Sequence, residues 1–227
     1  MTFPIVEIFG PTIQGEGLLV GMPSIFVRFG GCDFRCRWCD SMFAVKKKYE
    51  TEWQSLSVAE IVEQVQSLSR SSKPTITLTG GNPALFDLTD LIVTLKKDDY
   101  LVNVETQGSI AQPWFSNCDF VTLSPKPPSA GNYTHALEDC ITAAGSASKV
   151  LKVVIADRTD FDYALDLSRQ FTDIDIVLQP VNDTEQTSPD CRPLFLEIQN
   201  WLVEEDVANV RLIPQLHVWA WGNKRGV

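Results

Sequence analysis

Short apolar runs alternate with amphipathic segments along most of the chain. Runs rich in β-branched and apolar residues predict strands, and segments whose apolar residues recur every three or four positions predict helices. The predicted strands are residues 24–29, 75–79, 101–106, 120–124, 151–155, 175–179 and 210–216. The predicted helices are residues 57–70, 88–97, 161–170 and 193–205. At the start of the first helix, Ser57 and Glu60 have the spacing of a capping box.

This alternation of strands and helices indicates an α/β fold with a mostly parallel sheet buried on both faces. About six strand–helix units in so short a chain fit either an incomplete barrel or an open doubly wound sheet, and the pattern alone does not choose between them. The 227 residues contain no linker, repeat or low-complexity tract. We therefore expect a single domain.

Polar and glycine-rich clusters follow the C-terminal ends of the predicted strands. These clusters are residues 30–32, 80–83, 105–108, 124–126, 179–180 and 215–217. Ligands bind at this edge of the sheet in parallel α/β proteins. The clusters therefore predict one shared site.

Composition narrows the possible partners. The chain is 44% hydrophobic and 21% charged, as in ordinary globular proteins, and its net charge is −10. This acidic balance argues against broad electrostatic binding of nucleic acid or of an anionic membrane, since either would require a basic face. We find no secretory signal and no apolar run near the ~20 residues that span a bilayer, so we expect a cytoplasmic protein that binds neither nucleic acid nor membrane.

Three of the six cysteines, Cys32, Cys36 and Cys39, lie within eight positions with the spacing C-x3-C-x2-C. Three thiolates on one short loop can bind three irons of a 4Fe–4S cluster and leave the fourth iron open for chemistry. Zinc or a purely structural role is the alternative, although zinc sites usually use paired C-x2-C hooks. The scattered Cys118, Cys140 and Cys191 are interpreted as small hydrophobic residues.

With Trp38 directly before the third cysteine, this motif resembles the signature of the radical S-adenosylmethionine (SAM) superfamily. The resemblance implies a 4Fe–4S cluster whose open iron binds SAM, which is cleaved to a 5′-deoxyadenosyl radical after one-electron reduction. It also implies a partial (β/α)6 barrel, similar to a TIM barrel, as a single domain over residues 1–227, with the cluster loop at residues 30–41.

Further motifs, spread nearly end to end, resemble the 7-carboxy-7-deazaguanine synthase family. They are EIF (7–9), TIQGEG (12–17), FVR (26–28), CDS (39–41), ETQG (105–108), SPKPP (124–128), PQLH (214–217) and WGNKRG (221–226). This resemblance implies conversion of 6-carboxy-5,6,7,8-tetrahydropterin to 7-carboxy-7-deazaguanine with loss of ammonia, in the biosynthesis of queuosine. It further implies a homodimer and a C-terminal segment, residues 214–227, that closes the active site.

Several side chains suit a flat pterin that carries a carboxylate. Together with the resemblance, they give the predicted substrate contacts Ile13, Gln14, Gly15, Glu16, Arg28, Thr79, Glu105, Gln179 and His217. For Arg28 the alternative is a salt bridge to a neighbouring acid, since a guanidinium in an apolar strand must find a partner. For Glu16 it is a role in a turn, and for His217 it is a place in the core or on the surface.

The resemblance also assigns residues to the cofactors. The predicted SAM contacts are Trp38, Gly81, Asn82, Ser124, Pro125 and Lys126, and Ser41 is the predicted ligand of Mg2+. Mg2+ takes few protein oxygens, so one hydroxyl is sufficient. Many radical enzymes carry Glu where this chain has Asn82, and a neutral amide cannot form an ion pair with the ammonium group of SAM.

Two other functions compete with the synthase. One is a radical SAM activase that acts on a partner protein, and the other is a metal-binding module without catalytic activity. Lys46, Lys47 and Lys48 follow the cluster loop and form either a solvated face or the docking point of an acidic electron donor such as flavodoxin.

Overall fold

The computed structural model of the protein describes residues 1–69, 71 and 73–227. Its strands are β1 (Thr2–Ile13), β2 (Pro23–Phe29), β3 (Gln54–Ser57), β4 (Thr75–Gly80), β5 (Val102–Thr106), β6 (Phe120–Leu123), β7 (Ser148–Ile155), β8 (Asp175–Pro180) and β9 (Val210–Leu212). Its α-helices are α1 (Met42–Val45), α2 (Val58–Leu68), α3 (Thr89–Lys97), α4 (Leu137–Ala143), α5 (Arg158–Gln170), α6 (Arg192–Val203) and α7 (Leu216–Trp221). Short 3-10 turns are η1 (Gly17–Leu19), η2 (Lys47–Glu52), η3 (Pro83–Leu85), η4 (Pro113–Asn117) and η5 (Pro128–Ala130).

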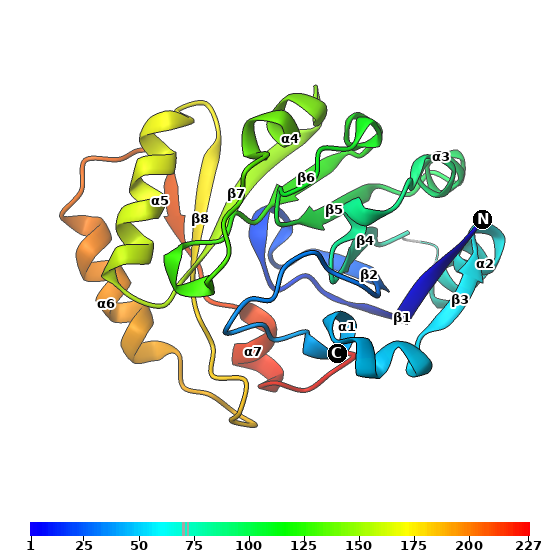
Figure 1. Cartoon of the computed structure of the whole chain (residues 1–227), viewed down its shortest axis with the longest axis horizontal. Helices are drawn as coiled ribbons and strands as arrows, with labels where there is room; N and C mark the ends of the chain where they lie inside the picture. Colours follow the sequence, from blue (N-terminus) through cyan, green and yellow to red (C-terminus); the bar gives the residue numbers. More distant parts are fainter. Residues whose placement is uncertain (70, 72) are drawn as a thin grey trace.

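All the strands join one sheet in the order β3-β1-β2-β4-β5-β6-β7-β8-β9. Strand β2 and strands β4 to β9 run parallel, whereas β1 runs antiparallel to both β2 and β3. Helices α2 to α6 lie around the outside of the sheet, and α1 and α7 lie near its lower edge (Figure 1). This is the single-domain α/β architecture with a mostly parallel sheet that the sequence predicts.

A turn packs on the inner face of the sheet. It connects β1 and β2, contains η1, and contacts β6 and β7. Gly17 in this turn has a φ of +63°, and a Cβ there would lie 3.1 Å from the side chain of Thr122 on β6. The central strands are buried on both faces, as the sequence predicts, with helices on the outer side and this turn on the inner side.

Most predicted elements are confirmed to within a few residues. The capping box of α2 is present, with the Glu60 backbone N–H donating to the Ser57 hydroxyl and the Ser57 backbone N–H donating to the Glu60 carboxylate. Its apolar face is buried through Ile61, Val62 and Val65. The predicted end of this helix at Arg70 lies outside the described residues.

The structure corrects the predicted last strand. Residues 210–216 do not form one strand, because β9 ends at Leu212 and α7 begins at Leu216. Pro214 between them has no N–H to continue a sheet ladder. The antiparallel β1 and β3 have no counterpart among the predicted strands.

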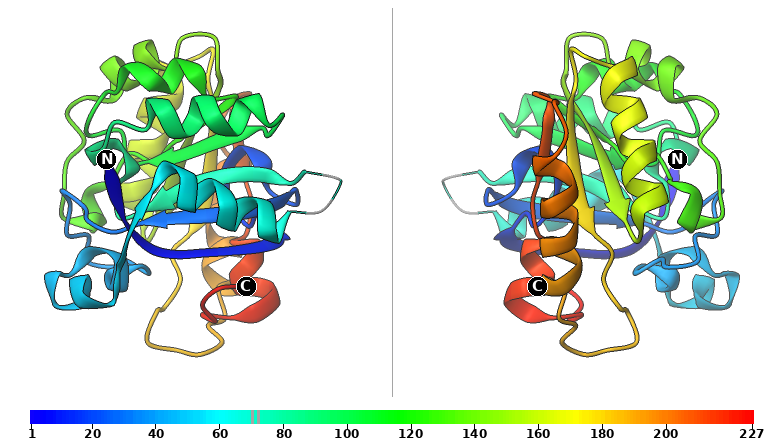
Figure 2. Two further views of the ribbon diagram at one scale, coloured as in Figure 1. Left: turned by 90° about the vertical axis from the view of Figure 1, so that its right-hand side faces the viewer. Right: turned by 90° about the vertical axis from the view of Figure 1, so that its left-hand side faces the viewer.

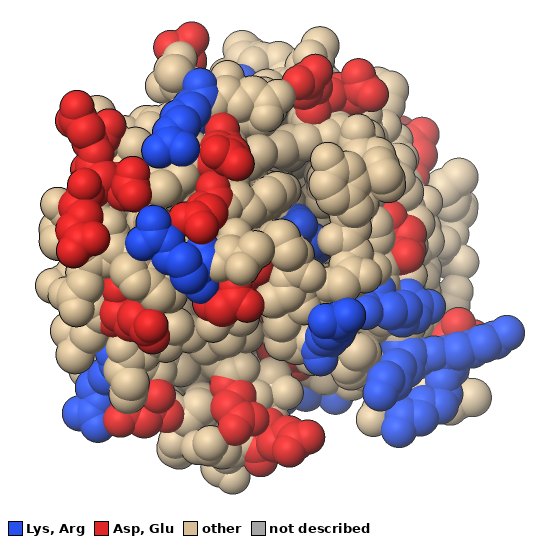
Figure 3. All heavy atoms as spheres, turned by 60° about the vertical axis from the view of Figure 1, so that its left-hand side comes forward, with Lys and Arg blue, Asp and Glu red and all other residues tan. Residues whose placement is uncertain are grey.

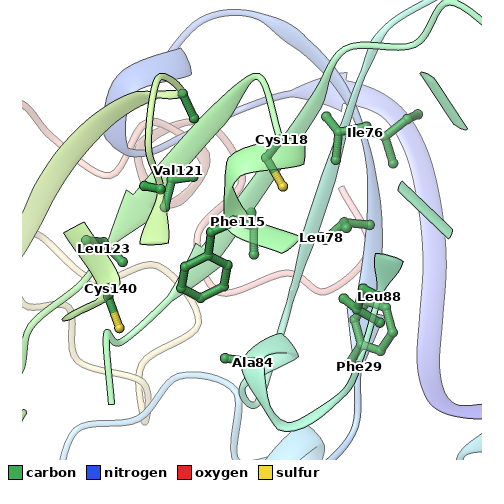
Figure 4. Close-up of a cluster of buried hydrophobic side chains, with 14 of the residues drawn as sticks. Phe29, Ile76, Leu78, Ala84, Leu88, Phe115, Cys118, Val121, Leu123 and Cys140 are labelled. Atoms are coloured by element: carbon green, nitrogen blue, oxygen red, sulfur yellow. The ribbon is translucent and has the colours of Figure 1, made fainter. Parts of the chain in front are cut away.

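A continuous core lies between the sheet and its outer helices. Its largest fully buried side chains include Trp114, Phe29 and Phe115. Cys118 and Cys140 point into this packing beside Phe115 (Figure 4) and are buried, as expected for small hydrophobic residues. Among the described residues, no helix is both long and apolar enough to cross a bilayer.

Candidate active site

One cavity at the C-terminal ends of the parallel strands brings most of the predicted site residues together. Those that line it are Ile13, Gln14, Gly15, Glu16, Arg28, Cys32, Cys36, Trp38, Cys39, Ser41, Thr79, Gly81, Glu105, Ser124, Lys126 and His217. The predicted residues Asn82, Pro125 and Gln179 are not part of its wall. Gln179 is fully buried and donates from Nε2 to the carbonyl of Pro214, at 3.3 Å, so it holds the start of the C-terminal segment.

The three clustered cysteines lie on one wall of this cavity as free thiols. Two side-chain amides donate to their sulfurs: Gln107 Nε2 to Cys32 Sγ and Asn132 Nδ2 to Cys36 Sγ, each at 3.5 Å. Burial raises the pKa of all three thiols, that of Cys39 to about 12. A bound cationic group would be needed to keep such sulfurs as thiolates.

The three thiols suit the separate irons of one 4Fe–4S cluster. They are close enough that charge on Cys36 or Cys32 acts on Cys39. The cysteine ligands of such a cluster bind separate irons and need not converge on one point, as the ligands of zinc must.

Two glycines let the cluster loop pack against the end of β4. A Cβ at Gly81 would lie only 1.9 Å from the carbonyl oxygen of Gly31 in the loop. The same Gly31 carbonyl accepts a hydrogen bond from the Asn82 N–H at 2.8 Å, and the Gly31 N–H donates to the carbonyl of Ala44. A side chain at position 81 would therefore separate the loop from the strand.

A buried ion pair forms the floor of the cavity. Glu16, in the turn after β1, pairs with Lys152 of β7 and also accepts a hydrogen bond of 2.5 Å from Gln215 Nε2. Burial alone would raise the pKa of Glu16, but the charges of Lys152 and His217 and the hydrogen bonds outweigh it and lower that pKa to about 2. Burial also works against the charge of Lys152, yet Glu16 and Glu105 raise its pKa above the ordinary value. Both groups are therefore charged at neutral pH.

A second chain of polar side chains joins the β1–β2 turn to β4 and β5. Gln14 Nε2 donates to Glu105 Oε1, and the Thr79 hydroxyl donates to Glu105 Oε2, both at 3.1 Å. Gln14 also accepts from the Glu16 N–H. Gly15 contacts His217 so closely that a Cβ there would lie 2.4 Å from the imidazole Nδ1. These contacts place amide, carboxylate and imidazole groups along one side of the cavity.

Arg28 forms the salt bridge considered from the sequence and also lines the cavity. Its Nε donates to Glu7 Oε1 at 2.8 Å, so the predicted alternative of a salt bridge is present. Its guanidinium carbon also lies 5.6 Å from the centre of the Phe43 ring, and the side chain lines the cavity. Arg225, near the C-terminus, binds the other oxygen of Glu7 at 2.9 Å and lies 3.9 Å above the same ring.

Three of the predicted SAM residues, Trp38, Ser124 and Lys126, line the cavity and contact one another. Lys126 Nζ donates to the Ser124 hydroxyl at 2.9 Å and lies 5.9 Å from the Trp38 ring centre. Burial lowers the pKa of Lys126. The Trp38 indole donates to Ser129, whose hydroxyl donates to Asp160 on α5. This chain of contacts fixes the orientation of the tryptophan that precedes the third cysteine.

The C-terminal segment lies beside the long loop between β8 and α6 (Figure 2). Asn223 Nδ2 donates to the carbonyls of Asp183 and Gln186 in that loop. The Leu216 N–H donates to the carbonyl of Gly15. The last residues, Gly222 to Val227, all line the cavity.

Sequence reasoning missed Lys152 and Gln107, which line the cavity, and Asp33, which accepts a hydrogen bond from Gln107. Lys152 carried a detectable signal, because it is a charged residue inside the apolar run of β7, and the argument applied to Arg28 applies to it equally. Gln107 and Asp33 carried no such signal, since only the fold brings the amide and the carboxylate together.

The Glu16–Lys152 pair predicts how the free energy of unfolding depends on pH. A carboxyl whose pKa is lower in the folded state contributes stability above its unfolded pKa of about 4.3, and this is lost as the pH falls toward the folded value. We expect the free energy of unfolding to fall between about pH 5 and pH 2, and less steeply in Glu16→Gln. Urea titrations of the cluster-free chain at several pH values measure this, and identical slopes in both proteins would contradict it.

Comparisons with known proteins agree with this geometry. Residues 26–118 match the radical SAM superfamily. The chain is 36% identical to 7-carboxy-7-deazaguanine synthase of Bacillus cereus, over 99% of this chain and 98% of that protein. It is 35% identical to the synthase of Bacillus subtilis, again over 99% and 98%. The crystal structure of QueE from Escherichia coli superposes with a TM-score of 0.72 at 26% identity, over 96% and 95% of the two chains.

Proposed function

Because this chain belongs to the 7-carboxy-7-deazaguanine synthase family of radical SAM enzymes, we propose that its cavity converts 6-carboxy-5,6,7,8-tetrahydropterin to 7-carboxy-7-deazaguanine with loss of ammonia. The observation that carries the proposal is the shared cavity itself. It has three cysteine thiols on one wall and the chain of Gln14, Glu105 and Glu16 on another. The alignments with the two Bacillus synthases span nearly the full length of both chains, which supports the same reaction.

Cys32, Cys36 and Cys39 would hold the 4Fe–4S cluster, and SAM would bind between them and the wall of Trp38, Ser124 and Lys126. When bound and reduced by one electron, this pair of cofactors supplies the 5′-deoxyadenosyl radical that starts the rearrangement. The protein's part is to bind, orient and exclude water. Amide donors on Cys32 and Cys36 would stabilise the negative charge of the ligated sulfurs.

The polar chain suits the flat edge of a pterin, which offers both donors and acceptors. Glu105 and Glu16 accept hydrogen bonds, Gln14 both donates and accepts, and these groups are already held in place by one another. Lys152 keeps Glu16 ionised, so that carboxylate can accept from the N–H groups of the substrate. Arg28, held by Glu7 through Nε, would present its remaining N–H groups to the substrate carboxylate.

Mg2+ would bind at Ser41, at the end of the cluster loop. The Ser41 hydroxyl donates to the neighbouring Asp40 carboxylate at 2.6 Å, and both are hard oxygen donors of the kind that Mg2+ takes. The ion would orient the substrate carboxylate and neutralise charge there.

Anaerobic turnover tests the proposal. Reconstituted protein, incubated with the carboxypterin, SAM and dithionite, is expected to form 7-carboxy-7-deazaguanine, identified by absorbance and mass, and to do so faster with Mg2+. Ser41→Ala should lose the response to Mg2+, whereas Ser116→Ala, which removes an exposed hydroxyl on η4, should keep it. Cleavage of SAM without this product would favour the activase, and one zinc without iron would favour the non-catalytic module.

An acidic electron donor such as flavodoxin would dock on a basic surface near the cluster loop. Lys46, Lys47 and Lys48 are exposed there, although the whole chain has a net charge of −10. Basic side chains gather at the lower right of Figure 3, while acidic ones spread over the rest of that face. Opposite charges steer such encounters and are screened by salt.

Neutralising all three lysines to glutamine is expected to slow reduction by flavodoxin about tenfold or more at low salt. Reduction by dithionite, a small molecule that needs no docking surface, should change little. Stopped-flow absorbance of the cluster measures both rates. An equal decrease in the reduction rate with both reductants would contradict the assignment of these lysines as a docking surface.

A homodimer is the expected assembly. Exposed apolar side chains that a second copy could cover include Leu196 and Val203 on α6 and Trp219 on α7. Analytical ultracentrifugation distinguishes one copy from two, and a protein that stays monomeric at micromolar concentration would contradict the assignment.

A further inference from the structure

Asp33, which follows the first cluster cysteine, is hydrogen-bonded to Asn82. Asn82 Nδ2 donates to Asp33 Oδ1 at 2.8 Å, and Gln107 Nε2 donates to the same oxygen at 2.6 Å. The two amides come from the ends of β4 and β5, whereas Asp33 lies in the cluster loop. The carboxylate is therefore fixed by two different strand ends.

Asn82 itself has no hydrogen-bonding capacity left. Its Nδ2 also donates to the Ser109 hydroxyl at 3.2 Å, and its Oδ1 accepts from the Ala84 N–H at 3.2 Å and from the Thr106 hydroxyl at 2.7 Å. The side chain is 0% exposed. An amide that makes all four of its hydrogen bonds within the protein cannot also receive the ammonium group of SAM.

We propose that Asp33 supplies the carboxylate that many radical enzymes carry as Glu at position 82, and that Asn82 is the positioning residue that holds it. In this chain the carboxylate lies in the cluster loop, at Asp33, and the amide lies after β4, at Asn82. An enzyme with Glu at position 82 has its carboxylate after β4 instead. Asp33 then serves as the acceptor for the ammonium group of SAM. This inference rests on the proposed function, in which SAM is the cofactor.

The surroundings of Asp33 suit that role. Asp33 is exposed and lies at the edge of the cavity, between Cys32 and Phe34 of its wall, and Gln107 joins Asp33 to the sulfur of Cys32. Both amides bind Oδ1, and within the described residues Oδ2 accepts no hydrogen bond. One oxygen is thus held and the other is open to a cation. A charge-assisted hydrogen bond to such an oxygen is stronger than one to a neutral amide.

Isosteric exchange tests the pairing without changing side-chain volume. In Asn82→Asp two carboxylates face each other and the amide donor is lost, so we expect the full-length chain before reconstitution to melt about 2–8 °C lower. The double variant Asp33→Asn/Asn82→Asp restores one donor and one acceptor, because the amide now at position 33 can donate to the carboxylate at position 82. Its melting temperature should return to within about 2 °C of wild type. A double variant no more stable than Asn82→Asp would overturn the pairing.

SAM affinity tests the functional part. Asp33→Asn keeps the acceptor for both amides, so its melting temperature should stay near wild type, while its SAM dissociation constant rises about tenfold or more. Asp33→Glu keeps the charge and should bind SAM within a few-fold of wild type. The probe is the change that SAM causes in the electron paramagnetic resonance of the reduced cluster, and Asp90→Asn, an exposed acid on α3, is the charge control.

The outcomes separate this inference from the proposed function. Wild-type affinity in Asp33→Asn would overturn the role of Asp33 and leave the synthase assignment intact. A wild-type protein whose cluster does not respond to SAM would overturn both. The melting temperatures test the contact between Asp33 and Asn82 in the chain without cofactors. They therefore decide whether the pairing exists, whatever the result of the SAM measurements.

Discussion

Replacing Cys36 with alanine is expected to abolish formation of 7-carboxy-7-deazaguanine. Cys36 is the buried member of the three clustered thiols, and without it two sulfurs would have to hold the cluster. Enzymes accelerate their reactions by at least about 10⁶-fold, so loss of the group that supplies the radical should bring turnover below detection. Iron after anaerobic reconstitution should fall from about four atoms per chain to well below one.

Cys140→Ala is the matched control. Like Cys36→Ala, it removes the sulfur of a buried cysteine. Cys140, however, lies in α4 within the hydrophobic core rather than in the cavity. This variant should lose some stability, since it leaves a small void, but it should retain iron and turnover. Full activity in Cys36→Ala, or equal loss of iron in both variants, would contradict the assignment of the cluster ligands.

Replacing Lys152 with methionine is expected to have the largest effect on stability. Methionine matches the length of the lysine stem, but it leaves the buried carboxylate of Glu16 without its cation. Breaking a buried ion pair from one side typically costs about 3–5 kcal/mol of the free energy of unfolding. Urea denaturation of the full chain at pH 7 measures this cost, and turnover of any folded fraction should also fall.

The double variant Lys152→Met/Glu16→Gln separates the pair from simple packing. It removes both charges and keeps the hydrogen bond that Gln215 can make to a side-chain oxygen at position 16. Most of the lost stability should return, because no unpaired charge remains buried. A loss below about 1 kcal/mol in Lys152→Met alone would show that the carboxylate finds another partner.

The sequence pattern predicts the repeated part of the fold well and its irregular parts poorly. Strands such as β4 (TITLTG) and β7 (SKVLKVVI) are rich in β-branched and apolar residues because both of their faces are buried, so they stand out from their surroundings. Strand β1 is interrupted by Gly10 and Pro11, and β3 is the polar segment QSLS. Their places in the sheet depend on pairing with distant strands, which residue periodicity does not encode.

The same division holds for the site. Clustered cysteines at a fixed spacing are visible in the sequence, because one loop supplies all three. By contrast, Glu16 and Lys152 are 136 positions apart, and Asp33 and Asn82 are 49 apart. Such pairs exist only once the β1–β2 turn and the cluster loop have packed against the strand ends. Sequence reasoning therefore named Glu16 and Asn82 without their partners.

The central claim is that three cysteines leave one iron of a 4Fe–4S cluster open for SAM. Electron paramagnetic resonance of the anaerobically reconstituted, reduced protein tests this most directly, recorded with and without SAM. The account predicts the signal of a reduced 4Fe–4S cluster whose g values shift when SAM is added. Absence of a cluster signal, or a signal that SAM leaves unchanged, would contradict it.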